Sequence, residues 1–221
     1  MSIQAEVFRG QHGSAFLQSR LASLSFVDSA AAAAFYALNP NNQSHTSADP
    51  TPVLIRCRLV INNPLTTDGA DPFIEFQDLE TKVGTEAAIS LMLRHSEHVT
   101  GTSAWEDLFA ERYPNLQALV NDDPSQLKEL YLQMWPLLDH PDSVATLKKA
   151  GIDGAVYRGS GMSMNAVEYR AFDESQVLER AVFTNLPIAL SFNDVLNGAA
   201  LDWEHLVPLE APPMRRVPRP C

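Results

Sequence analysis

Alternating hydrophobic and polar residues mark the strands that the sequence predicts most clearly. In residues 53–61 (VLIRCRLVI), Cys57 and Leu59 fall on one face with two isoleucines, while Arg56 and Arg58 fall on the other. Because successive side chains of a strand point to opposite faces, this pattern predicts a strand with one buried face. The same period predicts shorter strands at residues 3–9, 24–27, 154–158 and 166–172.

Apolar residues at helical spacing predict the second group of elements. Asp28 and Ser29 offer an N-cap to the alanine-rich run 30–38, which ends at an Asn-Pro pair. The region from about 75 to 150 is mostly helical, and four prolines separate its helices. Weaker patterns predict short helices at 15–24, 143–150 and 187–200.

The order of these elements predicts an α+β fold with a helical insertion, or lobe, at about 75–150. A glycine-containing turn is expected at 10–13, and a polar loop is expected at 39–52. We expect one main domain over residues 1–186. Residues 187–221 form a C-terminal extension, and its proline-rich tail is expected to be loosely held.

Composition and charge limit the classes of protein that the chain can belong to. Its 221 residues correspond to about one domain, and 45% of them are hydrophobic, which is enough to build a core. The net charge of −11 disfavours binding to nucleic acid or to an anionic membrane, since both need clustered cations. No apolar run approaches the roughly 18 residues that a membrane-spanning helix needs, and the N-terminus lacks the pattern of a secretory signal. We therefore expect a soluble, cytoplasmic protein without membrane partners.

Three short segments carry the residues that are candidates for chemistry. Arg9 ends the first predicted strand and Gly10 follows it, while Ser25 and Phe26 lie in the second. Glu168 interrupts an otherwise apolar strand late in the chain. A carboxylate in such a setting is costly to desolvate unless it is paired or used, so Glu168 is a functional candidate.

In this order, the segments resemble the motifs of the mono-ADP-ribosyltransferase superfamily, in particular its phage-borne and polyvalent-protein-associated branch. Arg9-Gly10 resembles the first motif, and Ser25-Phe26, with Tyr36 eleven residues after the serine, resembles the second. Residues 58–65 resemble the Asn-Pro segment of that branch. Residues 150–157 and 168–177 resemble its closing hairpin, whose third-motif glutamate corresponds to Glu168.

The resemblance implies a split β-sandwich fold and a site that uses NAD as a substrate, without a metal. Glu168 would be the catalytic anion beside an oxocarbenium-like ribose, and Ser25 would orient it. The backbone of Gly10 would hold the nicotinamide carboxamide, and Tyr36 would stack on the ring. Arg9 would contact phosphate or ribose, and Phe26 would complete the cofactor-binding set.

The implied activity is transfer of ADP-ribose to a target macromolecule, expected to be a protein, by a phage inhibitor or a bacterial toxin or effector. Arginine-modifying relatives carry a second glutamate two residues before the catalytic one, where this chain has Ala166. We therefore expect an acceptor other than arginine. Two alternatives stay open: an NAD glycohydrolase toxin on the same fold, and a non-catalytic binding protein. The helical region and the extension would select the target.

Other candidates have simpler interpretations. His95 and His98, with Glu97 between them, could suggest a metal site, but the spacing is equally that of a solvated helix face, which we favour. Cys57 is expected in the core, and the three tryptophans are expected to pack. Residues 159–161 (GSG) predict a flexible loop rather than a phosphate-binding loop, since no lysine and helix follow. The resemblance implies that this loop borders the acceptor site.

Overall fold

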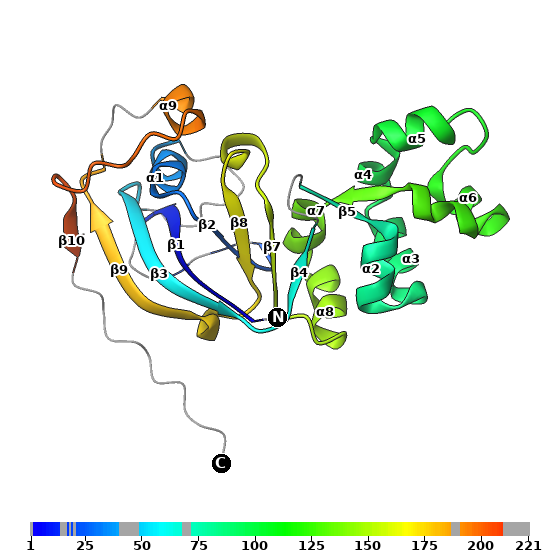
Figure 1. The fold of residues 1–221 in the computed structure, drawn as a ribbon, viewed down its shortest axis with the longest axis horizontal. Helices are drawn as coiled ribbons and strands as arrows, with labels where there is room; N and C mark the ends of the chain where they lie inside the picture. Colours follow the sequence, from blue (N-terminus) through cyan, green and yellow to red (C-terminus); the bar gives the residue numbers. More distant parts are fainter. Residues whose placement is uncertain are drawn as a thin grey trace, which may run out of the picture.

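The computed structural model describes residues 2–13, 17, 19, 21–39, 49–67, 72–186 and 191–209. Its main feature is an eight-stranded sheet with the strand order β10-β9-β3-β1-β2-β8-β7-β4 (Figure 1). The strands are β1 (Ile3–His12), β2 (Leu24–Val27), β3 (Pro52–Ile61), β4 (Pro64–Thr66), β7 (Gly154–Arg158), β8 (Val167–Ala171), β9 (Val177–Thr184) and β10 (Val207–Leu209). Together with the helices described below, this sheet makes the fold α+β, as the sequence predicts.

The sheet consists of two halves that meet between β1 and β2. Neighbouring strands are antiparallel, apart from the parallel pair β4 and β7. β1 pairs with β3 along its whole length, but it pairs with β2 at Phe8 opposite Val27. The two halves are therefore one hydrogen-bonded sheet with a narrow join.

Strand β1 is longer than the sequence pattern indicates. The expected turn at 10–13 is wrong for its first three residues, because Gly10, Gln11 and His12 continue the pairing with the start of β3. The chain turns at Gly13, whose φ of 83° lies in the left-handed region that glycine tolerates. Arg9 consequently lies inside the strand and not at its end.

Helix α1 (Ala30–Leu38) packs on one face of β1 and β3. Ser29 caps it as expected, since its hydroxyl oxygen accepts a hydrogen bond from the backbone of Ala32 at 3.2 Å. The buried face of the helix consists of alanines, which let it approach the sheet closely. At Gly10 the approach is so close that a Cβ atom would overlap the carbonyl oxygen of Ala33. This packing explains the glycine without reference to a ligand.

The opposite face of the sheet carries a second apolar cluster. Its buried members are Val7, Phe26, Cys57, Leu59, Ile61, Ala171 and Val177. Cys57 is a core residue, as expected, and burial raises its pKa to about 12. The thiol is therefore protonated at neutral pH and a poor nucleophile.

Strand β9 was not predicted from the sequence. Glu179 and Arg180 interrupt its apolar pattern, and the pairing of β9 with β3 shifts register between Arg56 and Arg58. Glu179 adopts a φ of 50° at this irregularity. A bulge of this kind breaks the period of two on which strand prediction depends.

The helical lobe is confirmed over residues 73–149 (Figure 1). Its elements are β5 (Phe73–Glu75), α2 (Phe76–Val83), α3 (Thr85–Arg94), α4 (Ser96–Thr100), α5 (Ser103–Leu108), α6 (Leu116–Asp122), the 3-10 turn η1 (Pro124–Glu129), β6 (Tyr131–Gln133), α7 (Met134–Asp139) and α8 (Pro141–Lys149). The short pair β5 and β6 was not expected. Trp105 packs in the lobe core, which continues onto the main sheet through Leu65, Ala155 and Tyr157.

Two weaker helix predictions have different outcomes. In the segment expected to be a helix at 15–24, residues 17, 19 and 21–23 are not helical, and the remaining residues before Leu24 lie outside the described part. Leu24 itself begins β2. In the second segment, α9 (Phe192–Leu196) forms, while residues 187–190 lie outside the described part.

The described part of the C-terminal extension, residues 191–209, packs against the sheet and α1. Leu201 and Leu206 are buried in the cluster beneath α1, and β10 pairs with β9. Most of the expected loop at 39–52 and the tail from residue 210 lie outside the described residues. Across the residues that the structure covers, none of the helices combines the length and apolar character needed to cross a membrane.

The contact between Gly10 and α1 leads to a stability prediction. We expect Gly10→Ala to lower the free energy of unfolding by about 3 kcal/mol or more, because the added methyl group must displace backbone and not a flexible side chain. Gly101→Ala is the matched control, since its Cβ would lie 3.2 Å from a single carbonyl oxygen. Urea denaturation of both variants measures the effect, and equal stabilities would contradict this packing.

Candidate functional site

A cleft of about 290 Å³ is lined by residues of β1, β2, β8, α1 and α7. It is lined by side chains from both the sheet and the lobe. The lining residues are Phe8, Arg9, Gly10, Leu21, Ser25, Phe26, Val27, Ala33, Tyr36, Trp135, Asp139, Ser160, Ser163, Glu168 and Arg170. The lining therefore includes all six site residues that the sequence analysis proposed, which are Arg9, Gly10, Ser25, Phe26, Tyr36 and Glu168.

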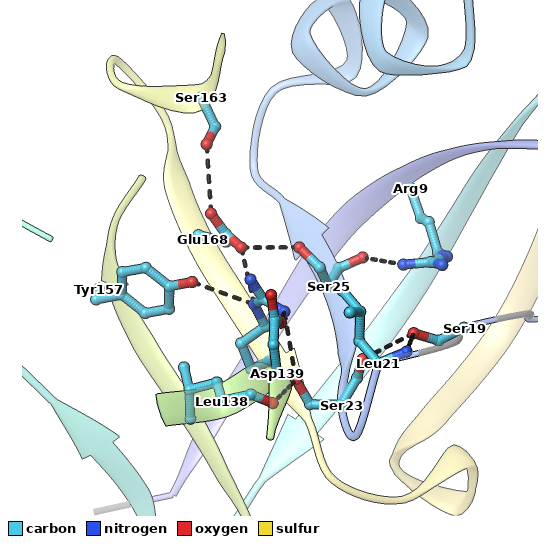
Figure 2. Close-up of polar contacts among 11 residues, drawn as sticks. Arg9, Ser19, Leu21, Ser23, Ser25, Leu138, Asp139, Tyr157, Ser163 and Glu168 are labelled. Atoms are coloured by element: carbon cyan, nitrogen blue, oxygen red, sulfur yellow. Dashed lines mark hydrogen bonds and ion pairs between the residues drawn. The ribbon is translucent and has the colours of Figure 1, made fainter. Parts of the chain in front are cut away.

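Glu168 is held at this cleft by three side chains (Figure 2). The hydroxyl of Ser25 donates to its Oε1 atom at 2.9 Å, and the Nε of Arg170 donates to the same oxygen at 2.8 Å. Ser163 donates to Oε2 at 3.3 Å. Pairing of β2 with β8 places Ser25 opposite Arg170, which brings both donors to one side of Glu168. The expected contact between Ser25 and Glu168 is thus present.

Arg170 is a buried cation with two carboxylate partners. Besides Glu168, it contacts Asp139, whose Oδ1 accepts a hydrogen bond from Nη1 at 2.7 Å. Its Nε also lies 3.1 Å from the hydroxyl of Tyr157. Burial opposes the charge, but the interactions with Tyr157, Glu168 and Asp139 outweigh it and raise the pKa of Arg170 well above its usual value. The guanidinium is therefore charged at any physiological pH.

The lobe reaches the cleft through the end of α7. The hydroxyl of Ser23 donates to the carbonyl of Leu138 at 2.9 Å, and the amide of Ala22 donates to the carbonyl of Asp139 at 3.2 Å. Trp135, from the same helix, forms part of the cleft wall and is half-buried. Residues just before β2 thus fasten the lobe beside the candidate catalytic carboxylate.

Arg9 joins the two halves of the sheet from inside β1. It is buried, and its Nη1 donates to the carbonyl of Ser25 at 2.8 Å while its Nε donates to Gln11 at 3.1 Å. Burial, followed by the charge of Arg170, lowers the pKa of Arg9 to about 10. The side chain remains cationic at neutral pH, so it contributes a positive charge to the cleft.

Tyr36 and Phe26 differ in what they offer to a ligand. Tyr36 lies on α1 at the cleft, and burial, together with the charge of Glu168, raises the pKa of its hydroxyl. Its half-buried ring can border a bound molecule. Phe26 is 1% exposed, and its ring packs in the cluster with Val7 and Cys57 on the other face of the sheet. Phe26 therefore supports the cleft from behind.

Ala166 does not line the cleft. It is buried in the cluster that also holds Phe8, Val27 and Ala33 beneath α1. A carboxylate at this position would enter an apolar cluster.

The loop between β7 and β8 contains several hydrogen bonds. Arg158 Nε donates to the carbonyl of Met164 at 2.7 Å, and Asn165 donates to the carbonyl of Leu196 at 2.8 Å. A Cβ at Gly159 would overlap Ser163, so the glycine permits the turn η2 (Gly161–Ser163). The loop thereby presents Ser163 to Glu168.

His95 and His98 belong to the lobe and not to the cleft. His95 is buried, and its Nε2 lies 2.8 Å from the hydroxyl of Ser143. The ring of His98 packs edge-on against Trp135, with ring centroids 5.1 Å apart. Among the residues that the structure describes, no group of three or more His, Cys, Asp or Glu side chains is arranged to hold a metal ion.

Sequence reasoning missed five further side chains that contact Glu168 or Arg170 or line the cleft beside them. These are Trp135, Asp139, Tyr157, Ser163 and Arg170. Arg170 had a local signal, because it shares a strand face with Glu168 inside an apolar strand. Asp139 had no such signal in the sequence, because it lies 31 residues before Arg170 in the chain and the fold of the lobe brings the two side chains together.

The chain matches no protein-family model, no curated protein and no solved structure. The likeness to ADP-ribosyltransferases therefore rests on the motifs and on the meeting of their residues in one cleft.

The buried histidine of the lobe predicts a pH dependence of stability. Burial, then the nearby His140, His98 and Arg94, lower the pKa of His95 from 6.5 to about 4. The unfolded chain therefore binds a proton that the folded chain excludes, so stability is fully present above pH 6.5 and falls as the pH approaches 4. We expect this residue to account for a loss of about 1–3 kcal/mol over that interval.

Thermal denaturation of the wild type and of His95→Gln from pH 7 to pH 4.5 isolates this contribution. The wild type should lose more stability than the variant, while the exposed control His205→Gln should follow the wild type. Parallel curves for the wild type and His95→Gln would show that His95 titrates normally.

Proposed function

We propose that the chain is an NAD-dependent ADP-ribosyltransferase that modifies a target protein. The observation that carries the proposal is the fixed carboxylate of Glu168, held by Ser25, Ser163 and Arg170 in a cleft that Arg9 and Tyr36 also border. Four of them, Arg9, Ser25, Tyr36 and Glu168, come from the three segments that resemble the family's motifs. The hydrogen bond from Ser25 to Glu168 agrees with the role that the resemblance implies for Ser25.

The chemistry needs an anion at the point where positive charge develops. When the bond between nicotinamide and ribose breaks, its electron pair leaves with nicotinamide, and the ribose becomes oxocarbenium-like. Glu168 would stabilise that charge, and its three hydrogen bonds keep it in place before the reaction, so little energy is spent on reorganisation. The acceptor then bonds to the same ribose carbon and gives up its proton.

The residues of the cleft fit part of an NAD molecule. A volume of about 290 Å³ lies at the lower end of the ~300–1,000 Å³ common for small-molecule sites, which suits nicotinamide and its ribose. Tyr36 offers a ring for stacking, and Arg9 offers positive charge to a phosphate or ribose oxygen. Gly10 borders the cleft, so its backbone is placed to meet a carboxamide.

The environment of Ala166 favours an acceptor other than arginine. With an apolar cluster at that position, no carboxylate there can engage an incoming guanidinium. The same observation favours a second candidate, an NAD glycohydrolase, in which water attacks the ribose instead of a protein side chain.

The proposal also covers the fold, the lobe and the place where the enzyme acts. The two sheet halves, joined at Phe8 and Val27, would correspond to the split β-sandwich of the superfamily. The lobe at 73–149 contributes Trp135 and Asp139 to the lining of the cleft and would contact the protein target. Such an enzyme would act in the cytoplasm of a host or target cell, as a phage inhibitor or as a toxin or effector.

Glu168→Gln tests the catalytic role directly. We expect NAD turnover to fall about a hundredfold or more, because the amide keeps the shape of the side chain but removes its charge. Release of nicotinamide from NAD, followed by chromatography, measures the rate. Glu6→Gln, at an exposed position of β1, is the control and should retain wild-type turnover.

Turnover within a few-fold of wild type in Glu168→Gln would remove Glu168 from the chemistry. The products of the wild-type enzyme separate the two candidate reactions. Rapid release of free ADP-ribose without a protein partner identifies a glycohydrolase, whereas labelling of a protein from the host or target cell identifies a transferase.

A further inference from the structure

Asp139 has a place in the cleft that the motif residues do not explain. It ends α7 of the lobe, its side chain is 21% exposed, and it borders the same cleft as Glu168. Arg170 contacts both carboxylates: its Nε donates to Glu168 at 2.8 Å, and its Nη1 donates to Asp139 at 2.7 Å. One guanidinium therefore connects an acid from the lobe with an acid from the sheet.

The charges around Glu168 show why a second acid is needed. Among the residues that the structure describes, the charged groups at the cleft are Arg9 from β1, Arg170 and Glu168 from β8, and Asp139 from α7, while Tyr36 from α1 and Tyr157 from β7 are neutral at physiological pH. With Asp139 ionised, these groups sum to zero. Without it they would sum to +1, which would oppose a cationic ribose.

We propose that Asp139 is a positioning residue for Glu168, which holds Arg170 in place and offsets its positive charge. This inference rests on the proposed function, in which Glu168 stabilises a cation. In this arrangement Arg170 can orient Glu168 by a hydrogen bond without leaving these groups with a net positive charge.

Geometry supports the assignment independently of charge. Nε and Nη1 belong to one planar group, so fixing Nη1 on Asp139 also fixes the direction in which Nε points. Asp139 is itself fixed, because its backbone carbonyl accepts a hydrogen bond from Ala22 and the neighbouring carbonyl of Leu138 accepts one from Ser23. The position of the lobe is thereby transmitted to Glu168 through two hydrogen bonds.

Contacts other than the Asp139 side chain also join the lobe to the sheet. Its apolar core continues onto the main sheet through Leu65, Ala155 and Tyr157. A substitution that preserves shape at Asp139 should therefore leave the lobe in place, which makes the role testable.

The first measurement is steady-state NAD turnover by Asp139→Asn. We expect kcat to fall at least about tenfold with KM changed less than about threefold, because the loss affects stabilisation of the transition state more than ground-state binding. Asp139→Glu keeps the charge and should recover most of kcat. Asp142→Asn is the matched control, since Asp142 pairs with Arg94 on the lobe surface. A kcat within twofold of wild type in Asp139→Asn would overturn the proposal.

The second measurement does not involve NAD. Hydrogen exchange of the Arg170 Nε–H, followed by nuclear magnetic resonance, should be at least about tenfold faster in Asp139→Asn than in the wild type or in Asp142→Asn. Equal exchange rates in all three proteins would overturn the positioning role. A wild type that leaves NAD intact, with Arg170 loosened in Asp139→Asn alone, would remove the proposed function and keep the role of Asp139.

Discussion

A single buried cation, Arg170, organises the structure around the candidate site. Removing a guanidinium from water costs several kcal/mol, and the cost is offset only when every partner is well placed. Arg170 meets this condition with carboxylates from Glu168 and Asp139 and with the hydroxyl of Tyr157. These partners come from β8, the lobe and β7, so satisfying one charge requires three parts of the chain to meet at one point.

The packing of the sheet against α1 provides the second constraint. Gly10 allows the carbonyl of Ala33 to approach β1, and the alanine face of the helix lies flat on the strands as a result. On the other side of the join, Arg9 bonds to the carbonyl of Ser25 and holds β1 against β2. The cleft lies between these contacts, which place Tyr36 on one wall and Glu168 on another.

The sequence predicts the parts of this arrangement that depend on local patterns. Strands 24–27 and 154–158 form as expected, because their apolar residues face cores that the chain does build. Glu168 stood out because an acid inside an apolar strand needs partners, and the structure supplies them. The contact of Ser25 with Glu168 was expected from the resemblance alone.

Other parts depend on contacts that no local pattern records. The end of β1 follows from pairing with β3 and overrides the turn signal at Gly10. The bulge near Glu179 breaks the alternating pattern of β9, so the sequence did not predict that strand. Asp139 reaches Arg170 only because the lobe folds back onto the sheet, and that is a property of the tertiary structure.

Binding of NAD to the wild-type protein is the most direct test of the account, because every proposed role in the cleft requires it. The melting temperature should be measured against NAD concentration, with ATP as a control for a nucleotide that lacks nicotinamide. For a Kd of about 0.1 mM, typical of enzyme–substrate pairs, 1 mM NAD should add about 1.4 kcal/mol and raise Tm by about 3–6 °C, saturably. No shift at several millimolar NAD, or an equal shift with ATP, would contradict the assignment of this cleft as an NAD site.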